Sequence, residues 1–115
     1  MNNYKQNDEL SLDVLNSIKS QSKITQRSLA EKLNVSLGSI NYCLKALVEK
    51  GFIKAENFKN TKNKISYTYF LTPKGLIEKL NLTKKFLLFK KNEYLQIQKD
   101  IKKLENDLLD FKRND

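Results

Sequence analysis

The side chains with the clearest capacity for chemistry lie close together between Ser36 and Lys45. Their hydroxyl, carboxamide, phenol and ammonium groups can hydrogen-bond to base edges and to phosphate oxygens. Asn41 has the carboxamide that pairs with adenine, and Lys45 has an ammonium that can reach guanine or a phosphate. Because the first two turns of a helix reach base edges best, the candidate contacts are Ser36, Leu37, Gly38, Ser39, Asn41, Tyr42 and Lys45. The alternative is that they are ordinary surface residues.

These residues need an element that presents them, and the run Ile24–Ile53 predicts two short helices joined by a tight turn. Thr25 can cap the first helix, Asn34-Val35-Ser36 can form the turn, and Ser36 can cap the second helix. Gly51 stands where a left-handed residue ends a helix. The second helix has a buried stripe formed by Ile40, Cys43, Leu44 and Leu47. Helices this short need a third element to bury their apolar faces, which is the helix-turn-helix arrangement.

Two further groups of residues are suited to holding phosphates. The first is the start of the first motif helix, where Thr25 and Gln26 present backbone amides and Arg27 adds charge. The second is a hairpin tip that has the basic and amide residues Lys59, Asn60, Lys62 and Lys64. Such a tip can lie along the DNA backbone or in the minor groove. Alternatively, it is a solvated loop that stays polar to protect exposed strand edges.

The charge balance fits a polyanionic partner. The 115 residues include 22 basic and 13 acidic ones, which gives a net charge of +9 and a pI near 9.6. Nine basic and only three acidic residues lie between Lys23 and Lys64, so the excess is concentrated around the predicted motif. A basic composition alone is also typical of lysine-rich proteins from AT-rich genomes. The charge therefore supports DNA binding only together with the motif.

Composition also argues against several classes of protein. The chain has no His, one Cys and three Gly, so it lacks the ligands of a zinc site and the spacing of a phosphate-binding glycine loop. No catalytic set is present, so we expect neither an enzyme nor a cofactor. No stretch approaches the ~20 apolar residues of a membrane span, and no signal-peptide core follows Met1. A single cysteine cannot form an internal disulfide, so the cytoplasm is the expected compartment.

The remaining pattern predicts a mainly α-helical fold with a small β-hairpin wing, that is, a winged helix-turn-helix followed by a long C-terminal helix. A first helix is expected from about Asp8 to Ser20, and Ile24 is a candidate for a very short strand. The segments 52–58 and 65–71 are rich in β-branched and aromatic residues and predict the hairpin. Thr72-Pro73 then opens another helix, with Thr72 as its cap.

A heptad pattern dominates the C-terminal part of the chain. Apolar residues recur every seven positions, with a second set between them, and the predicted seam contains Leu87, Tyr94, Ile97, Ile101, Leu104, Leu108 and Phe111. Asn81-Leu82-Thr83 can be a kink or a fresh cap. The alternative to self-association is a helix packed on its own domain, but residues 83–113 span ~45 Å, more than a small domain can cover. We therefore expect a DNA-binding domain over 8–80 and a dimerisation helix over 83–113.

Two features invite a chemical reading but have a structural explanation. Cys43 lies beside the buried stripe, where packing is a better explanation than redox sensing, since a sensor needs an exposed thiol of low pKa. Tyr67, Tyr69 and Phe70 could line a ligand pocket, but strand aromatics usually pack against the core and across the sheet.

The segment Thr25–Lys54, followed by a wing and then by YFLTPKG, resembles the MarR family of bacterial winged-helix regulators. The stretch from Asn41 to Gly75 is more similar to the short MarR-type regulators associated with exopolysaccharide biosynthesis clusters. The resemblance covers about Leu10 to Phe89. It implies a homodimer that binds a roughly palindromic operator, usually to repress, with recognition helices in successive major grooves and wings in the flanking minor grooves.

The sequence also departs from that family. Asn57-Phe58-Lys59 replaces a common Asp-x-Arg pattern, and a single C-terminal helix replaces an interleaved helical dimer domain. These departures argue against the family's phenolic ligand pocket, so a small-molecule effector is not expected but stays open. In a parallel pair, Asp100 would repel Glu105 and Asp107 would attract Lys112, so these two pairs do not decide the helix direction.

The function expected from the sequence is a sequence-specific transcriptional regulator, most simply a repressor, whose partners are double-stranded DNA and a second copy of itself. The alternative is a protein-interaction module in which the coiled coil is the working part. Steep salt dependence of binding to duplex DNA distinguishes the regulator from the module.

Overall fold

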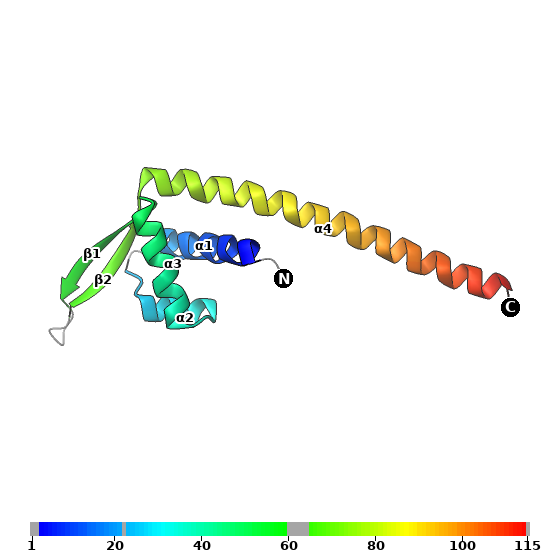
Figure 1. Ribbon diagram of the computed structural model, residues 1–115, viewed down its shortest axis with the longest axis horizontal. Coiled ribbons are helices and arrows are strands. Elements are labelled where there is room, and N and C mark those ends of the chain that lie inside the picture. The colour runs from blue at the N-terminus through cyan, green and yellow to red at the C-terminus, as the bar shows by residue number, and fades with distance from the viewer. Residues whose placement is uncertain (1–2, 22, 60–64, 115) are drawn as a thin grey trace. The chain divides into compact units, whose positions relative to one another are not determined.

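The computed structural model describes residues 3–21, 23–59 and 65–114, with the side chains of 7–21, 23–56 and 67–113. The elements along the chain are α1 (Asn3–Ser20), α2 (Gln26–Leu33), α3 (Leu37–Glu49), β1 (Ile53–Lys59), β2 (Ile65–Leu71) and α4 (Pro73–Asn114). Residues 1–83 and 84–115 form separate compact units (Figure 1). The predicted fold class, a mainly helical winged helix-turn-helix with a two-stranded wing and a long C-terminal helix, is confirmed.

The helix-turn-helix has the predicted caps. The Thr25 hydroxyl accepts a hydrogen bond from the Ser28 amide at 3.1 Å, and the Ser36 hydroxyl accepts one from the Ser39 amide at 3.0 Å. Asn34 closes α2 in the left-handed conformation, with φ of 55°. Each hydroxyl satisfies a backbone donor that has no partner within its helix, which fixes where α2 and α3 begin.

Helix α3 ends as the position of Gly51 predicts. Gly51 has φ of 77°, a conformation that side chains other than glycine rarely adopt. Its amide donates to the Val48 carbonyl at 3.0 Å, and the Phe52 amide donates to the Leu47 carbonyl at 2.9 Å. These two bonds form a Schellman motif, which turns the chain directly into β1.

Two expectations for the N-terminal part need correction. Helix α1 begins at Asn3, earlier than the expected Asp8, because neither Pro nor Gly interrupts the polar residues before Asp8. Ile24 lies in no strand; its side chain is 1% exposed and belongs to the core, so burial rather than strand pairing explains an apolar residue there.

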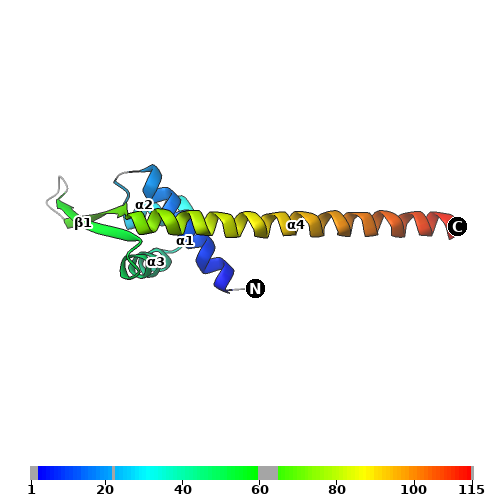
Figure 2. The ribbon, with the colours of Figure 1, turned by 90° about the horizontal axis from the view of Figure 1, so that it is seen from above.

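The wing is an antiparallel hairpin in which Ile53 pairs with Leu71 and Lys59 pairs with Ile65. Figures 1 and 2 both show it projecting beyond α2 and α3. The hairpin tip, residues 60–64, lies outside the described residues.

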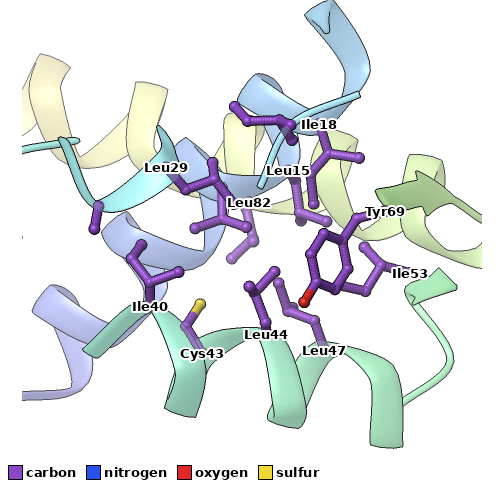
Figure 3. Close-up of a cluster of buried hydrophobic side chains, with 13 residues drawn as sticks. Leu15, Ile18, Leu29, Ile40, Cys43, Leu44, Leu47, Ile53, Tyr69 and Leu82 are labelled. Atoms are coloured by element: carbon purple, nitrogen blue, oxygen red, sulfur yellow. The ribbon is translucent and has the colours of Figure 1, made fainter. Parts of the chain in front are cut away.

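The core of the first unit draws on every helix and both strands (Figure 3). Its buried side chains include Val14, Leu15, Ile18, Ile24, Leu29, Ile40, Leu44, Leu47, Ile53, Tyr69 and Leu82. Burial of each large apolar side chain contributes roughly 1.5–3 kcal/mol. Helix α1 therefore provides the third element that α2 and α3 require.

The start of α4 is tied to the end of α3 through Thr72, which caps α4 as predicted. The Thr72 hydroxyl accepts from the Gly75 amide at 3.0 Å and donates to the Gly51 carbonyl at 2.6 Å. A Cβ on Gly75 would lie 1.9 Å from the carbonyl oxygen of Phe52, so only glycine fits there. The sequence Thr72-Pro73-Lys74-Gly75 thus forms a close joint between helix and wing.

Helix α4 continues through Asn81-Leu82-Thr83 without the break that these residues could have produced. The Thr83 hydroxyl donates to the Lys79 carbonyl at 2.7 Å, which satisfies it within the helix. Leu82 is 7% exposed and packs in the core of the first unit. Over the described residues, no helix combines the length and apolar character needed to cross a membrane.

Candidate nucleic-acid interface

Helix α3 divides cleanly into a buried face and an open face. Ile40, Cys43, Leu44 and Leu47 point into the core, as predicted (Figure 3). The candidate base contacts Ser36, Leu37, Gly38, Ser39, Tyr42 and Lys45 are exposed. Tyr42, at 77%, is the most exposed large apolar or aromatic side chain among the described residues. The helix therefore presents hydrogen-bonding groups over its first two turns on one accessible surface.

Gly38 has no packing reason to be glycine. A Cβ built there would meet no atom closer than the Ser36 Oγ at 3.9 Å, and its φ is not in the left-handed region. Glycine at an exposed helical position costs up to ~1 kcal/mol relative to alanine. Close approach of an external partner to the backbone of α3 is a reason that would offset this cost.

Asn41 differs from the other candidates because it is half-buried and already bonded. Its Nδ2 donates to Gln26 Oε1 at 3.2 Å, and Gln26 Nε2 donates to the Tyr69 hydroxyl at 3.0 Å. The three side chains form a polar relay from β2 through α2 to α3. One N–H of the Asn41 amide and its carbonyl oxygen are not used by the relay, so bidentate pairing with adenine stays chemically possible.

Sequence reasoning missed this relay. It assigned the backbone amide of Gln26 to phosphate binding and gave its side chain no role, whereas that side chain bridges Tyr69 and Asn41 within the protein. The relay does not involve the backbone amide of Gln26, whose contact with phosphate stays a prediction. The alternation of side chains along the strand could have indicated that Tyr69 points inward. It could not have indicated which polar group would hydrogen-bond to the Tyr69 hydroxyl.

The start of α2 keeps the other features predicted for it. Arg27 is exposed, and Thr25 holds the first turn through its hydrogen bonds to Ser28. The amides of Gln26 and Arg27 stand in the first turn of α2, where they have no carbonyl partner within the helix. This is the arrangement that attracts an anion to a helix N-terminus.

An open groove of about 560 Å³ lies between α3 and the base of the wing. It is lined by Gln26, Asn41, Leu44, Lys45, Val48, Glu49, Ala55, Tyr67 and Tyr69. Tyr67, which is 48% exposed, adds an aromatic hydroxyl to the groove that Lys45 also lines. Sequence reasoning considered Tyr67 only for packing or for a ligand pocket, and did not place it beside α3.

The wing candidates are only partly described. The backbone of Lys59 ends β1 opposite Ile65, and its side chain lies outside the described part. Asn60, Lys62 and Lys64 fall within the tip that the structure does not describe. Their contact with DNA stays a prediction.

Cys43 is 7% exposed, and its Sγ lies 3.8 Å from the Ser11 hydroxyl. Burial raises the pKa of the Cys43 thiol, an effect that outweighs the lowering by the Ser11 hydrogen bond and by Lys50. A buried thiol of raised pKa is a poor nucleophile, which supports the packing interpretation. Over the described residues, no group of His, Cys, Asp or Glu side chains is placed to hold a metal ion.

The candidate dimer seam lies on α4. Its residues Leu87, Tyr94, Ile97, Ile101, Leu104, Leu108 and Phe111 are each more than half exposed. Leu88, Leu95 and Leu109 widen the apolar surface. Exposed apolar side chains that run together along a helix in this way make α4 a candidate interaction site.

Residues 7–54 match the sequence model of a family described as winged helix-turn-helix DNA-binding. Among curated proteins, no sequence matches the chain significantly.

Solved structures share the fold. A protein described as a transcriptional regulator from Thermoplasma acidophilum has 20% identity and a TM-score of 0.71, covering 76% of this chain and 89% of that one. A PadR-like transcriptional regulator from Bacillus cereus has 21% identity and a TM-score of 0.68, covering 77% and 91%. A MarR transcriptional regulator from Methanosarcina mazei has 21% identity and a TM-score of 0.61, covering 74% and 60%.

The chain therefore has the winged helix-turn-helix fold found in PadR- and MarR-type transcriptional regulators. The prediction that it is not an enzyme agrees with these comparisons, which are with DNA-binding or regulatory proteins.

Proposed function

We propose that this winged helix-turn-helix chain is a sequence-specific DNA-binding transcriptional regulator that acts in the cytoplasm as a homodimer. One observation carries the proposal: α3 buries one face in the core and leaves Gly38, Ser39, Tyr42 and Lys45 exposed on the other. Because one face of α3 is packed in the core and the opposite face is exposed, the helix can enter a major groove without rearrangement.

The remaining contacts would follow from the neighbours of α3. The first turn of α2 would hold a phosphate through its backbone amides, with Arg27 adding charge. The wing lysines would lie along the flanking backbone or in the minor groove. Tyr67 and Lys45, at the groove between α3 and the wing, would contact the DNA strand that passes between them. Phosphate contacts fix register, and α3 supplies the discrimination between bases.

The apolar seam of α4 supports the homodimer. A second copy covering Ile97, Ile101, Leu104 and Leu108 would remove a long exposed apolar surface from water. Two-fold pairing would also present two recognition helices to half-sites about one DNA turn apart, ~34 Å.

We extend the proposal to repression of an exopolysaccharide biosynthesis cluster. This extension rests on the resemblance of the stretch Asn41–Gly75 to regulators of such clusters. Chromatin precipitation that recovers promoters of polysaccharide genes, together with a rise in their transcripts on deletion, would support it. Binding at other promoters would indicate a DNA-binding regulator with another target. A fall in the transcripts on deletion would indicate an activator.

The proposal is tested by selecting bound sequences from a random duplex library with the full chain. We expect enrichment of an imperfect palindrome whose half-sites are centred about one helical turn apart. Lys45→Ala should change or erase the enriched sequence. Lys99→Ala is the matched control, because it removes one exposed lysine from α4, outside the proposed interface. Recovery of no preferred sequence would favour the protein-interaction module instead.

A further inference from the structure

We propose that Gln26 and Tyr69 are positioning residues that make Asn41 select adenine over guanine in the bound DNA, an inference that deepens the proposed function and rests on it. The three side chains form the relay that joins β2, α2 and α3. All three line the open groove between α3 and the base of the wing. The relay thus connects the core of the first unit to a side chain on the proposed recognition helix.

The far end of the relay is fixed in the core. Tyr69 is 4% exposed and lies among the buried side chains of the first unit, so close packing holds its ring in place (Figure 3). Gln26 is the first residue of α2, whose start is fixed by the Thr25 cap. The Nε2 of Gln26 donates to the Tyr69 hydroxyl at 3.0 Å, and this bond leaves the Gln26 oxygen turned toward Asn41.

The near end of the relay lies where DNA would enter. Asn41 stands in the second turn of α3, and its half-buried side chain lines the groove together with the exposed Lys45 one turn later. The last torsion of an asparagine side chain is broad and roughly two-fold, so an unrestrained carboxamide presents either its oxygen or its nitrogen to a partner. The bond from Asn41 Nδ2 to Gln26 Oε1, at 3.2 Å, restrains the carboxamide to one orientation.

The N–H that the relay uses determines what Asn41 can offer a base. An asparagine amide has two N–H donors and one carbonyl acceptor, and Gln26 takes one of the donors. The donor and the acceptor that are left match the N7 acceptor and the N6 donor that adenine shows in the major groove. Guanine shows two acceptors there, N7 and O6, so it would need both N–H groups. Asn41 held in this way therefore favours adenine.

The opposite orientation of the relay would favour the other purine. If the Gln26 carboxamide turned over, its N–H would face the Asn41 oxygen, and both N–H groups of Asn41 would be free for guanine. Loss of the Tyr69 hydroxyl would let Gln26 take either orientation. A buried hydroxyl on β2 would in this way affect the choice of base made by α3.

Selection from the random duplex library with the full chain tests the role of Tyr69. Asn41→Ala identifies the base position that depends on Asn41, and there the wild type should prefer adenine to guanine by ~5- to 150-fold. Tyr69→Phe keeps the buried ring and should lower this preference about 2- to 10-fold, the range expected for the loss of one hydrogen bond. The salt dependence of binding to random duplex DNA should not change, because the Tyr69 hydroxyl makes no proposed phosphate contact.

Thr68→Val is the matched control for Tyr69→Phe. It also removes a hydroxyl from a buried residue of β2, but the Thr68 hydroxyl donates to the Glu56 carbonyl within the wing, at 3.5 Å. The preference for adenine should therefore stay at the wild-type value in this variant. An equal fall in Thr68→Val and Tyr69→Phe would indicate a general effect of the wing and would overturn the role of the relay.

Two substitutions of Gln26 test the orientation of the relay. Gln26→Glu should retain the preference for adenine, because a carboxylate accepts from Asn41 as the carboxamide oxygen does, although its charge should weaken binding to all DNA alike. Gln26→Leu removes the relay and should lower the preference as Tyr69→Phe does. Because the side chain of Gln26 is only half-buried, these variants test the relay even if Tyr69→Phe fails to fold.

The remaining outcomes separate the relay from the proposed function. A wild type that enriches no sequence would overturn the proposed function itself. An enriched sequence with guanine at the position that depends on Asn41, or with no such position, would overturn the selection of adenine. A preference for adenine that Tyr69→Phe and Gln26→Leu both leave unchanged would overturn the positioning role, while DNA recognition by α3 would stand.

Discussion

At the scale of single residues, two glycines that look equivalent in the sequence have different reasons to be glycine. Gly75 faces the carbonyl of Phe52 in a close joint, and Gly38 faces open space on the outer side of α3. The first is required by the fold. The proposed approach of DNA to α3 would explain the second.

Gly75→Ala should lower the free energy of unfolding by ~1–3 kcal/mol or more, because the new methyl group would displace the backbone at Phe52. Gly38→Ala, the matched control, should raise it by up to ~1 kcal/mol, since alanine favours the helix. Urea denaturation of both variants measures the two changes. Equal stability of Gly75→Ala and wild type would contradict the close joint.

Gly38→Ala, although more stable, is also expected to bind the selected duplex less tightly than wild type does, because the added methyl group would keep α3 from the groove.

A second set of variants should distinguish the loss of a base contact from the loss of a phosphate contact. Asn41→Ala and Lys45→Ala should each cost ~1–3 kcal/mol on the selected sequence and relax the preference at one base position. Lys62→Ala, in the wing tip, should weaken all sequences alike and lower the salt slope by about one. Thermal denaturation must accompany Asn41→Ala, because this variant also removes the hydrogen bond that Gln26 Oε1 accepts from Asn41. If all three variants lost the same affinity for selected and for random DNA, the assignment of Asn41 and Lys45 to base recognition would be wrong.

At the scale of elements, the sequence predicted what local chemistry decides. Thr25, Ser36, Gly51 and Thr72 each end or begin a helix through bonds to residues within a few positions, so their pattern can be read without the fold. The wing followed in the same way from its β-branched and aromatic residues.

What the sequence left open depends on distant contacts. Gln26 bonds to Tyr69, 43 positions along the chain, and this contact gives its side chain a role that no local pattern indicates. Ile24 is apolar because α-helical neighbours bury it, and Leu82 keeps α4 tied to the core where a break was possible. Only the three-dimensional packing of the first unit reveals these roles.

At the scale of elements, the prediction concerns substitutions in the apolar seam of α4. Ile101→Asp combined with Leu104→Asp should convert the dimer to a monomer, because each chain would bring two carboxylates into the apolar seam. Operator affinity should fall by orders of magnitude as each half-site binds alone, while the circular dichroism of the winged unit is retained. Asn92→Asp with Asn106→Asp adds the same charge on the outer face and should leave the dimer intact. Sedimentation velocity reports the outcome, and a dimeric seam variant with full affinity would contradict the assignment.

At the scale of the whole molecule, the proposed function assigns different tasks to the two units of the chain. The first unit contains the core, the recognition helix and the wing, and the second unit contains only the exposed seam of α4. Most of the excess of basic residues lies in the first unit, between Lys23 and Lys64. If base recognition and self-association reside in different units as proposed, the variants above should have separable effects.

The most direct test is a titration of the full chain against its selected duplex and a scrambled duplex at several salt concentrations. We expect the selected site to bind at least ~10³-fold more tightly at physiological salt. Both affinities should fall steeply as salt rises, because lysines displace counterions from phosphates. Equal affinity for the two duplexes, or binding that does not change with salt, would contradict sequence-specific DNA recognition by this protein.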